Sequence, residues 1–343
     1  MGVTLKEIAA MAGVHRSTVD KVLHKRPGVS EEVRQRVQQV LDQTGYRPNL
    51  AGRALQKQAA SIRLAAILLN VDARPFIERG IRHAVETLHM CPVEVAFSSS
   101  AFGDVDTQVA QIQASIEQKM DGIILSPLSA EPVRQAVCRA SESGIPVVCT
   151  NTDLENAGRL CYVGENAAKA GRVAGRMLGE FLGGTGKIAV VTSTSALRAG
   201  TYFLYVRERS FLDYLHANFP QIEVAETLPS FENPSKTYHM TLDLLRERPD
   251  LDGIYIVGGG VGEVGRAIRE AGLGGKVKVI CFEDYPEILD LLREGIVTCT
   301  INSNTVRQGE LPVRVLVDYC MQDIQPSEQI YTPSEILVRE CLE

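Results

Sequence analysis

The sequence predicts an α/β protein in which a small all-α head precedes a two-lobed body built on two parallel, doubly wound sheets. Apolar residues in the first part of the chain have helical spacing, whereas from Arg63 onward short, nearly all-apolar strands alternate with helical segments. Such an alternation is typical of parallel sheets covered on both faces. The stretch MDGIILSP at Met120 is also echoed by LDGIYIVG at Leu251, which indicates two similar lobes.

Composition and charge fit a globular protein of two or three domains. The chain has 343 residues, of which 45% are hydrophobic and 23% charged. Residues 1–60 hold ten Lys and Arg against five Asp and Glu, although the whole chain carries a formal charge of −6. A basic head on an acidic body suggests that the head alone binds a polyanion.

Several classes of protein find no support in the sequence. The longest apolar run, Leu64 to Leu69, is far short of the roughly 20 residues of a membrane-spanning helix. The charged N-terminus is unlike a secretory signal, and the eight cysteines form no CxxC pair or Cys/His cluster. No HExxH, GxSxG or Walker motif is present. We therefore expect a cytoplasmic protein with reduced thiols, no metal, no cofactor and no catalysis.

The head predicts three short helices around one small core. Thr4-Leu5-Lys6-Glu7 fits a capping box, Gly13 supplies a turn, and Ser30 can cap a third helix. The apolar positions at helical spacing are Leu5, Ile8, Ala9, Ala12, Val19, Val22, Leu23, Val33, Val37, Val40 and Leu41. A tight turn between the first two helices makes a helix-turn-helix unit, whose second helix can enter a DNA major groove. The outward face of that helix holds Arg16, Ser17, Asp20 and Lys21.

These residues come in an order that resembles a known family. VTLKEIAAMAGVHRSTVDKVL and GYRPNLAGRAL resemble the head of LacI-family transcriptional repressors, with its T-x-x-x-[IV]-A-x-x-A-G-V-S-x-x-T-V-S-x-V-L and G-Y-x-P-N-x-x-A-x-x-L patterns. The resemblance implies a DNA-binding domain over 1–46 and a hinge helix over 47–60, whose leucine wedges into the minor groove. It implies DNA contacts by Thr4, His15, Arg16, Ser17, Thr18, Lys21, Asn49, Arg53 and Leu55. Asp20 and His15 stand where the family usually has serine, so the operator sequence does not carry over.

The body predicts a ligand site between its lobes. Its strands are RLAAILLN, VEVAF, DGIILSP, GIPVVCTN, KIAVVTS, DGIYIVGG and KVKVICFED. Ligands of parallel α/β sheets bind at the carboxyl ends of the strands, so we expect a cleft there.

A glycine motif in the body leaves a nicotinamide site as an alternative. Gly260, Gly262 and Gly265 fit G-x-G-x-x-G directly after a predicted strand, and Glu283 follows the next strand about twenty residues on, as in a dinucleotide fingerprint. The motif comes late in its domain, however, whereas a fingerprint usually opens the first βαβ unit. We favour a glycine-rich loop that lines the cleft with bare backbone.

The body also resembles the ligand-binding part of LacI-type repressors, which is related to periplasmic sugar-binding proteins. YVGENAAKAGRVAGRML, VRERSF and CFEDYPEILDLLREG stand in the family's order. The resemblance implies an effector domain over 61–343, with lobe 1 at about 61–160 and 296–324 and lobe 2 at about 161–292 and 328–343. It implies effector contacts by Asp72, Phe76, Ser126, Asn151, Asp153, Arg207, Gly259, Glu283 and Ser303. Planar polar groups and an aromatic ring are what a polyol requires.

Two departures from the family bear on the ligand. Gly259 and Gly260 replace an Asn-Asp pair that binds sugar hydroxyls in many relatives, and Ser303 replaces a frequent glutamine. The ligand could therefore be larger than a simple sugar, or phosphorylated and anchored by Arg207.

Together these features predict a transcriptional regulator, most simply a repressor, whose operator affinity depends on a sugar-type effector. We expect a homodimer that reads a pseudo-palindromic operator, because one small head offers few base contacts. A dimer is favoured over a tetramer. An NAD(H)-sensing regulator and a non-enzymatic sugar-binding protein are the alternatives, and whether the effector releases DNA or acts as a corepressor is open.

Overall fold

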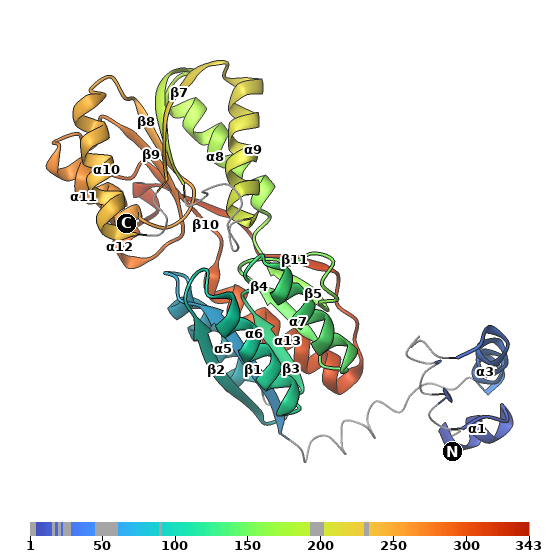
Figure 1. Ribbon diagram of the computed structural model, residues 1–343. Coiled ribbons are helices and arrows are strands. Elements are labelled where there is room, and N and C mark those ends of the chain that lie inside the picture. The colour runs from blue at the N-terminus through green and yellow to red at the C-terminus, as the bar shows by residue number, and fades with distance from the viewer. Residues whose placement is uncertain are drawn as a thin grey trace. The chain divides into compact units, whose positions relative to one another are not determined.

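A computed structural model describes residues 5–15, 18–19, 22, 29–44, 61–88, 91–192, 202–229 and 233–342 (Figure 1). The chain divides into two compact units, Met1–Gln56 and Lys57–Glu343, close to the predicted border between head and body. The predicted hinge helix, residues 47–60, lies outside the described residues.

The head contains the predicted core. Helix α1 (Leu5–Met11) ends at a turn in which Gly13 has a φ of +63°, a conformation that glycine adopts without strain. Helix α3 (Glu31–Thr44) carries Glu31 and Glu32 in its first turn, where the helix dipole favours acidic side chains. The buried residues are Ile8, Ala9, Ala12, Val19, Val22, Val37, Val40 and Leu41, all predicted as core positions.

The first lobe of the body is a parallel sheet with helices on both faces. Its strands, in spatial order, are β11 (Gln329–Tyr331), β5 (Cys161–Gly164), β4 (Val147–Thr150), β3 (Gly122–Leu125), β1 (Ile62–Leu69) and β2 (Val93–Ser100). One face packs on α6 (Val105–Glu117) and α7 (Glu131–Glu142). Helices α5 (Arg74–Thr87) and α13 (Thr305–Gln322) pair with each other on the opposite face (Figure 1).

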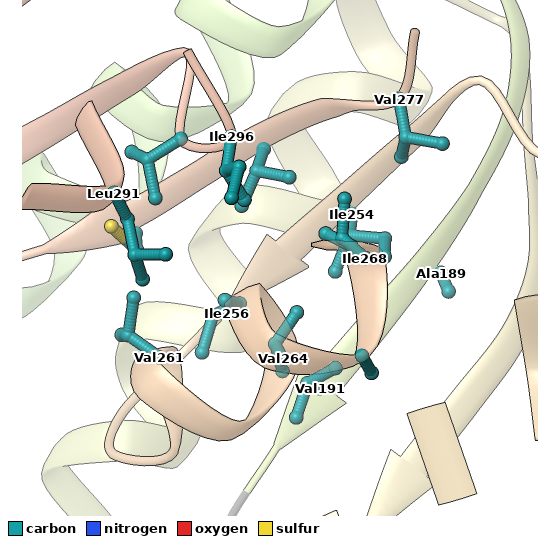
Figure 2. Close-up of a cluster of buried hydrophobic side chains, with 14 of the residues drawn as sticks. Ala189, Val191, Ile254, Ile256, Val261, Val264, Ile268, Val277, Leu291 and Ile296 are labelled. Atoms are coloured by element: carbon teal, nitrogen blue, oxygen red, sulfur yellow. The ribbon is translucent and has the colours of Figure 1, made fainter. Parts of the chain in front are cut away.

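The second lobe repeats this plan. Its strands, in spatial order, are β12 (Glu335–Leu337), β10 (Cys299–Asn302), β9 (Lys278–Phe282), β8 (Gly253–Ile256), β6 (Thr185–Thr192) and β7 (Gln221–Pro229), and β12 alone among the described strands runs antiparallel to its neighbour. Helices α8 (Ala167–Phe181) and α9 (Tyr202–Asn218) cover one face, and α10 (Pro234–Glu247), α11 (Val261–Glu270) and α12 (Pro286–Arg293) the other. A 3₁₀ helix, Arg339–Leu342, follows β12. Figure 2 shows the apolar layer in which Ile254 and Ile256 of β8 meet Val264 and Ile268 of α11.

In each lobe two helices approach until their backbones touch, and glycine makes this possible. A Cβ at Gly80 of α5 would lie 1.9 Å from the carbonyl oxygen of Val306, at the start of α13. In the second lobe, a Cβ at Gly171 of α8 would lie 2.1 Å from the carbonyl oxygen of Arg207 on α9. The second contact fixes the position of Arg207, because α9 is held against α8 at the residue itself.

The chain crosses between the lobes three times, and the crossings differ from the predicted boundaries. Strand β5, placed in lobe 2 by the sequence, pairs with β4 in lobe 1. Strand β10, placed in lobe 1, pairs with β9 in lobe 2, and β11, placed in lobe 2, pairs with β5 in lobe 1. An apolar run predicts a strand but not its partner, which long-range pairing decides. The crossing segments are therefore 165–166, 303–304 and 332–334.

Two further observations concern membranes and thiols. None of the helices in the described ranges is long and apolar enough to cross a membrane. All eight cysteines are free thiols.

Candidate functional site

A cavity of about 660 Å³ opens between the two lobes of the body. It lies where loops follow the carboxyl ends of β1, β4, β8 and β9, as the parallel-sheet argument predicts. Six of the nine sequence-predicted effector positions line it: Asp72, Phe76, Asn151, Arg207, Gly259 and Glu283.

The other three predicted positions are not part of the cavity wall. Asp153 forms a two-pronged ion pair with Arg159, at 2.5 Å and 2.8 Å, and lines a separate cavity of about 530 Å³. Ser126 is buried, and its backbone carbonyl accepts a hydrogen bond from Gln108 Nε2 at 3.0 Å. Ser303 lies directly behind the wall, where its hydroxyl donates to Glu283 Oε1 at 2.7 Å.

Arg207 is held in place by a buried ion pair. Its Nη2 lies 2.5 Å from Glu165 Oε2, and its Nη1 donates to the carbonyl oxygen of Val257 at 2.8 Å. The guanidinium carbon lies 3.8 Å from the centroid of the Phe282 ring. Its Nε, and Oε1 of Glu165, have no hydrogen-bond partner among the described atoms. The Arg207 guanidinium is thus a planar hydrogen-bond donor in the cavity wall. Its neighbours hold it in one position, and Glu165 balances its charge.

Glu165 was not found from the sequence. It stands between a strand and the Asn166 cap of α8, in the stretch GEN, where an acidic loop residue carries no special signal. Burial raises the pKa of its carboxyl group, and the Arg207 guanidinium opposes that rise.

Glu283 forms a second polar group of the cavity. Its backbone is left-handed, with a φ of +77°, and both carboxylate oxygens accept hydrogen bonds from the Ser303 hydroxyl. Burial and the nearby Glu165 raise the pKa of Glu283 to about 7, whereas Arg207 and Ser303 lower it. The carboxyl group can therefore donate or accept a hydrogen bond near neutral pH.

Aromatic rings from both lobes complete the wall. Phe76 of α5 stacks on Tyr285, which caps α12, with ring centroids 4.2 Å apart and planes 12° apart. Phe102, Phe203 and Phe282 line the same cavity. The sequence predicted Phe76 as an effector contact. It did not predict Tyr285, although Tyr285 directly follows the predicted strand KVKVICFED. Stacked rings and planar polar groups suit a ligand with both apolar faces and hydroxyls.

The glycine motif is explained by helix packing. Gly260 caps α11 with a φ of +89°. A Cβ at Gly262 would lie 2.0 Å from Glu287 Oε1, and one at Gly265 would lie 2.5 Å from Leu291 Cδ1. The glycines therefore allow α11 to pack on α12, and they require no dinucleotide.

Hydrogen bonds beside the cavity join the three crossing segments, 165–166, 303–304 and 332–334. We call these segments the hinge of the body, which is distinct from the predicted hinge helix of residues 47–60. The Gln308 amide donates to the carbonyl oxygen of Ser303 at 3.0 Å and accepts from Asn151 Nδ2 at 3.3 Å. Thr332 joins all three crossings, because its N–H donates to Gly164 O at 2.9 Å and its hydroxyl to Ser303 O at 2.7 Å. Movement between the lobes must pass through these bonds.

In the head, two of the predicted DNA-contacting residues can be placed. His15 is exposed and Thr18 partly exposed, and the Thr18 N–H donates to the His15 carbonyl at 2.8 Å. The remaining seven lie outside the described residues: Thr4, Arg16, Ser17, Lys21, Asn49, Arg53 and Leu55.

Comparison with known proteins agrees with both units. Residues 65–323 match the periplasmic binding protein domain, and residues 4–49 match the family of bacterial regulatory proteins named after lacI. The transcriptional regulator CelR of Thermobifida fusca is 26% identical over 98% of this chain and 97% of its own length. The D-allose-binding periplasmic protein of Escherichia coli K12 is 23% identical over 78% of this chain and 88% of its own length.

A solved structure also shares the body. A solute-binding protein of an ABC transporter from Burkholderia graminis, in complex with D-arabinose, is 28% identical with a TM-score of 0.75, and the match covers 82% of this chain and 96% of that protein. With a regulatory head and a periplasmic-binding body over nearly its whole length, the chain belongs to the lacI family of bacterial regulatory proteins.

Proposed function

We propose that this DNA-binding regulator is a cytoplasmic repressor whose operator affinity is set by a small hydroxylated ligand in the cleft between the lobes. The observation that carries the proposal is the cavity itself. It combines stacked aromatic rings with Glu283 and with Arg207, whose Nε has no partner among the described atoms. The arrangement can bind and orient a polyol, and we propose no catalytic role for it.

The relatives support a carbohydrate-type ligand. The proteins that share the body include one that binds D-allose and one solved with D-arabinose. We propose that the predicted effector residues that line the cavity hold the ligand, and that Ser303 positions Glu283. Ser126 and Asp153 serve the lobe structure instead.

For DNA, we propose a homodimer on a pseudo-palindromic operator, read by Arg16, Ser17 and the other predicted positions of the head. When the ligand binds and the cleft closes, the two lobes change their relative position. This change alters how the two heads of the dimer pair on DNA. Such coupling is reciprocal, so a ligand that weakens operator binding must itself bind less tightly to the DNA-bound form.

The test has two stages. Thermal unfolding of the full chain is first measured with neutral sugars, sugar derivatives, sugar phosphates and NAD, since a ligand at a hundred times its Kd adds about 2.7 kcal/mol. Operator affinity is then measured with and without each stabilising compound. We expect a polyol-type ligand to change operator affinity. Stabilisation by NAD alone, or a bound ligand without effect on DNA binding, would contradict the proposal.

A further inference from the structure

We infer that the cleft selects a ligand that carries an ammonium group as well as hydroxyls, an amine-bearing polyol rather than a neutral or phosphorylated sugar. This inference rests on the proposed function, because it concerns the same cavity.

The described wall of the cavity is acidic. Asp72, Glu263, Glu283 and Glu287 line it, against the single cation Arg207 among the described lining residues. The charge of Arg207 is already balanced by Glu165, 2.5 Å away. A phosphate group would therefore meet more negative than positive charge, which argues against the phosphorylated ligand that the sequence left open.

Three of the lining carboxylates are exposed or partly exposed, and we call them the acidic mouth of the cavity: Asp72, Glu263 and Glu287. None of the three has an ion-pair or hydrogen-bond partner within the part of the chain that the structure describes. Burial, and then the charges of Glu263 and Asp72, raise the pKa of Glu287. The three carboxylates line one cavity, and their negative charges repel one another.

The acidic mouth spans the two lobes. Glu263 and Glu287 each stand in the first turn of a helix, where a carboxylate is favourable by itself. Helix dipoles do not account for Asp72, which follows β1 in the other lobe and lines the same cavity. Closing the lobes brings like charges together unless a cation lies between them.

The aromatic wall beside the acidic mouth also suits a cation. The Phe76 and Tyr285 rings stack across the cleft, and the Arg79 guanidinium lies 5.3 Å from the Phe76 centroid. Tyr285 and Arg79 lie against Phe76 itself, so a ligand ammonium group would gain from the carboxylates and from the other rings that line the cavity. A metal ion does not fit, because no described group of three His, Cys, Asp or Glu side chains is arranged to hold one.

The far end of the cavity calls for hydroxyls. Arg207 is 5% exposed, and its Nε lacks an acceptor among the described atoms. Arg207 lines the cavity, so a ligand oxygen can accept a hydrogen bond from its guanidinium group, while Glu283 exchanges hydrogen bonds with neighbouring hydroxyls. One end of the ligand is then hydroxylated and the other positively charged.

The experiment compares matched probes on the full chain at a pH where the amines are protonated. D-glucosamine is compared with D-glucose and D-glucose 6-phosphate, D-galactosamine with D-galactose, and N-methylglucamine with sorbitol, with ethanolamine as a small amine. Thermal unfolding and calorimetric titration are the readouts. We expect at least one amine to bind about threefold to fivefold more tightly than its neutral partner, and the phosphate not to bind.

Variants assign the preference to the acidic mouth. Asp72→Asn with Glu287→Gln should abolish the preference for the amine over its neutral partner, and should raise the ligand-free Tm by relieving repulsion. Glu94→Gln, at an exposed position of β2 outside the cavity, is the matched control and should keep the preference.

Two results overturn the inference. One is a neutral or phosphorylated probe that binds as tightly as its amine, and the other is the absence of stabilisation by every amine, ethanolamine included. Failure of the proposed function is a separate result, in which a bound probe leaves operator affinity unchanged.

Discussion

Glu283 shows how one partly buried carboxyl group ties stability to pH. Its pKa is raised from 4.5 to about 7 in the folded chain. Between these values the folded state keeps a proton that the unfolded state has lost, so stability falls as pH rises through this window. The side chain of the Glu283→Gln variant cannot ionise. We therefore predict that the free energy of unfolding of this variant falls by about 1–3 kcal/mol less than that of the wild type between pH 5 and pH 8. Urea unfolding across that range measures the difference.

The control for this prediction is again Glu94→Gln, whose exposed side chain should leave the wild-type pH dependence unchanged. If the Glu283→Gln curve runs parallel to that of the wild type, the carboxyl group is ionised throughout the window, and its hydrogen-bonding role in the cavity needs revision.

Single residues also show where sequence reasoning stops. Asn151 and Asp153 follow the same strand, yet Asn151 lines the cavity while Asp153 turns away to Arg159. A position after a parallel strand predicts the edge of the sheet but not the direction of the side chain. Glu165 and Tyr285 were missed because their roles come from partners distant in sequence, Arg207 and Phe76.

At the scale of elements, the predicted strands and the head core were found because apolar runs and helical spacing are local signals. The assignment of β5, β10 and β11 to lobes failed, since each is a short strand beside a crossing and its sheet is chosen by pairing across long separations. The close helix pairs were not predicted either, because a glycine inside a helix does not reveal what packs against it.

Helix packing gives a prediction about Gly171. A Cβ there would lie 2.1 Å from a backbone oxygen of α9, so Gly171→Ala must move α9 and with it Arg207. We expect a loss of about 1–3 kcal/mol in the free energy of unfolding, together with weaker ligand binding. At Gly175 on the same helix, a Cβ would first meet the Tyr214 side chain, at 3.1 Å.

Gly175→Ala is therefore the matched control for Gly171. It gains helix propensity of up to about 1 kcal/mol, and its Cβ would lie 3.3 Å from the nearest backbone atom of α9, the Phe211 oxygen, so shifts of a few tenths of an ångström suffice and we expect a change near zero. Denaturant unfolding of both variants checks the order. Equal effects of the two alanines would mean that backbone contact between α8 and α9 is not what holds Arg207.

At the scale of the whole molecule, the three crossings tie the two lobes of the body together. The lobes share a cavity, and the segment 303–304 belongs to both the hinge and the site, because Ser303 holds Glu283 while its carbonyl accepts from Gln308 and Thr332. A change in the hinge can thus reach the ligand without altering any residue that lines the cavity.

Thr332 separates these two roles. It is 5% exposed, and its hydroxyl donates to the Ser303 carbonyl at 2.7 Å. Thr332→Val keeps the shape and removes this bond, so we expect a loss of about 0.5–1.5 kcal/mol in stability. Ligand affinity and its response to operator DNA should change as well, because the Ser303 segment is less firmly held.

Thr332→Ser keeps the hydroxyl and should retain the wild-type ligand response in a titration with and without operator. If valine and serine behave alike, the hinge bond does not transmit the signal, and the lobes communicate through the Phe76–Tyr285 contact instead.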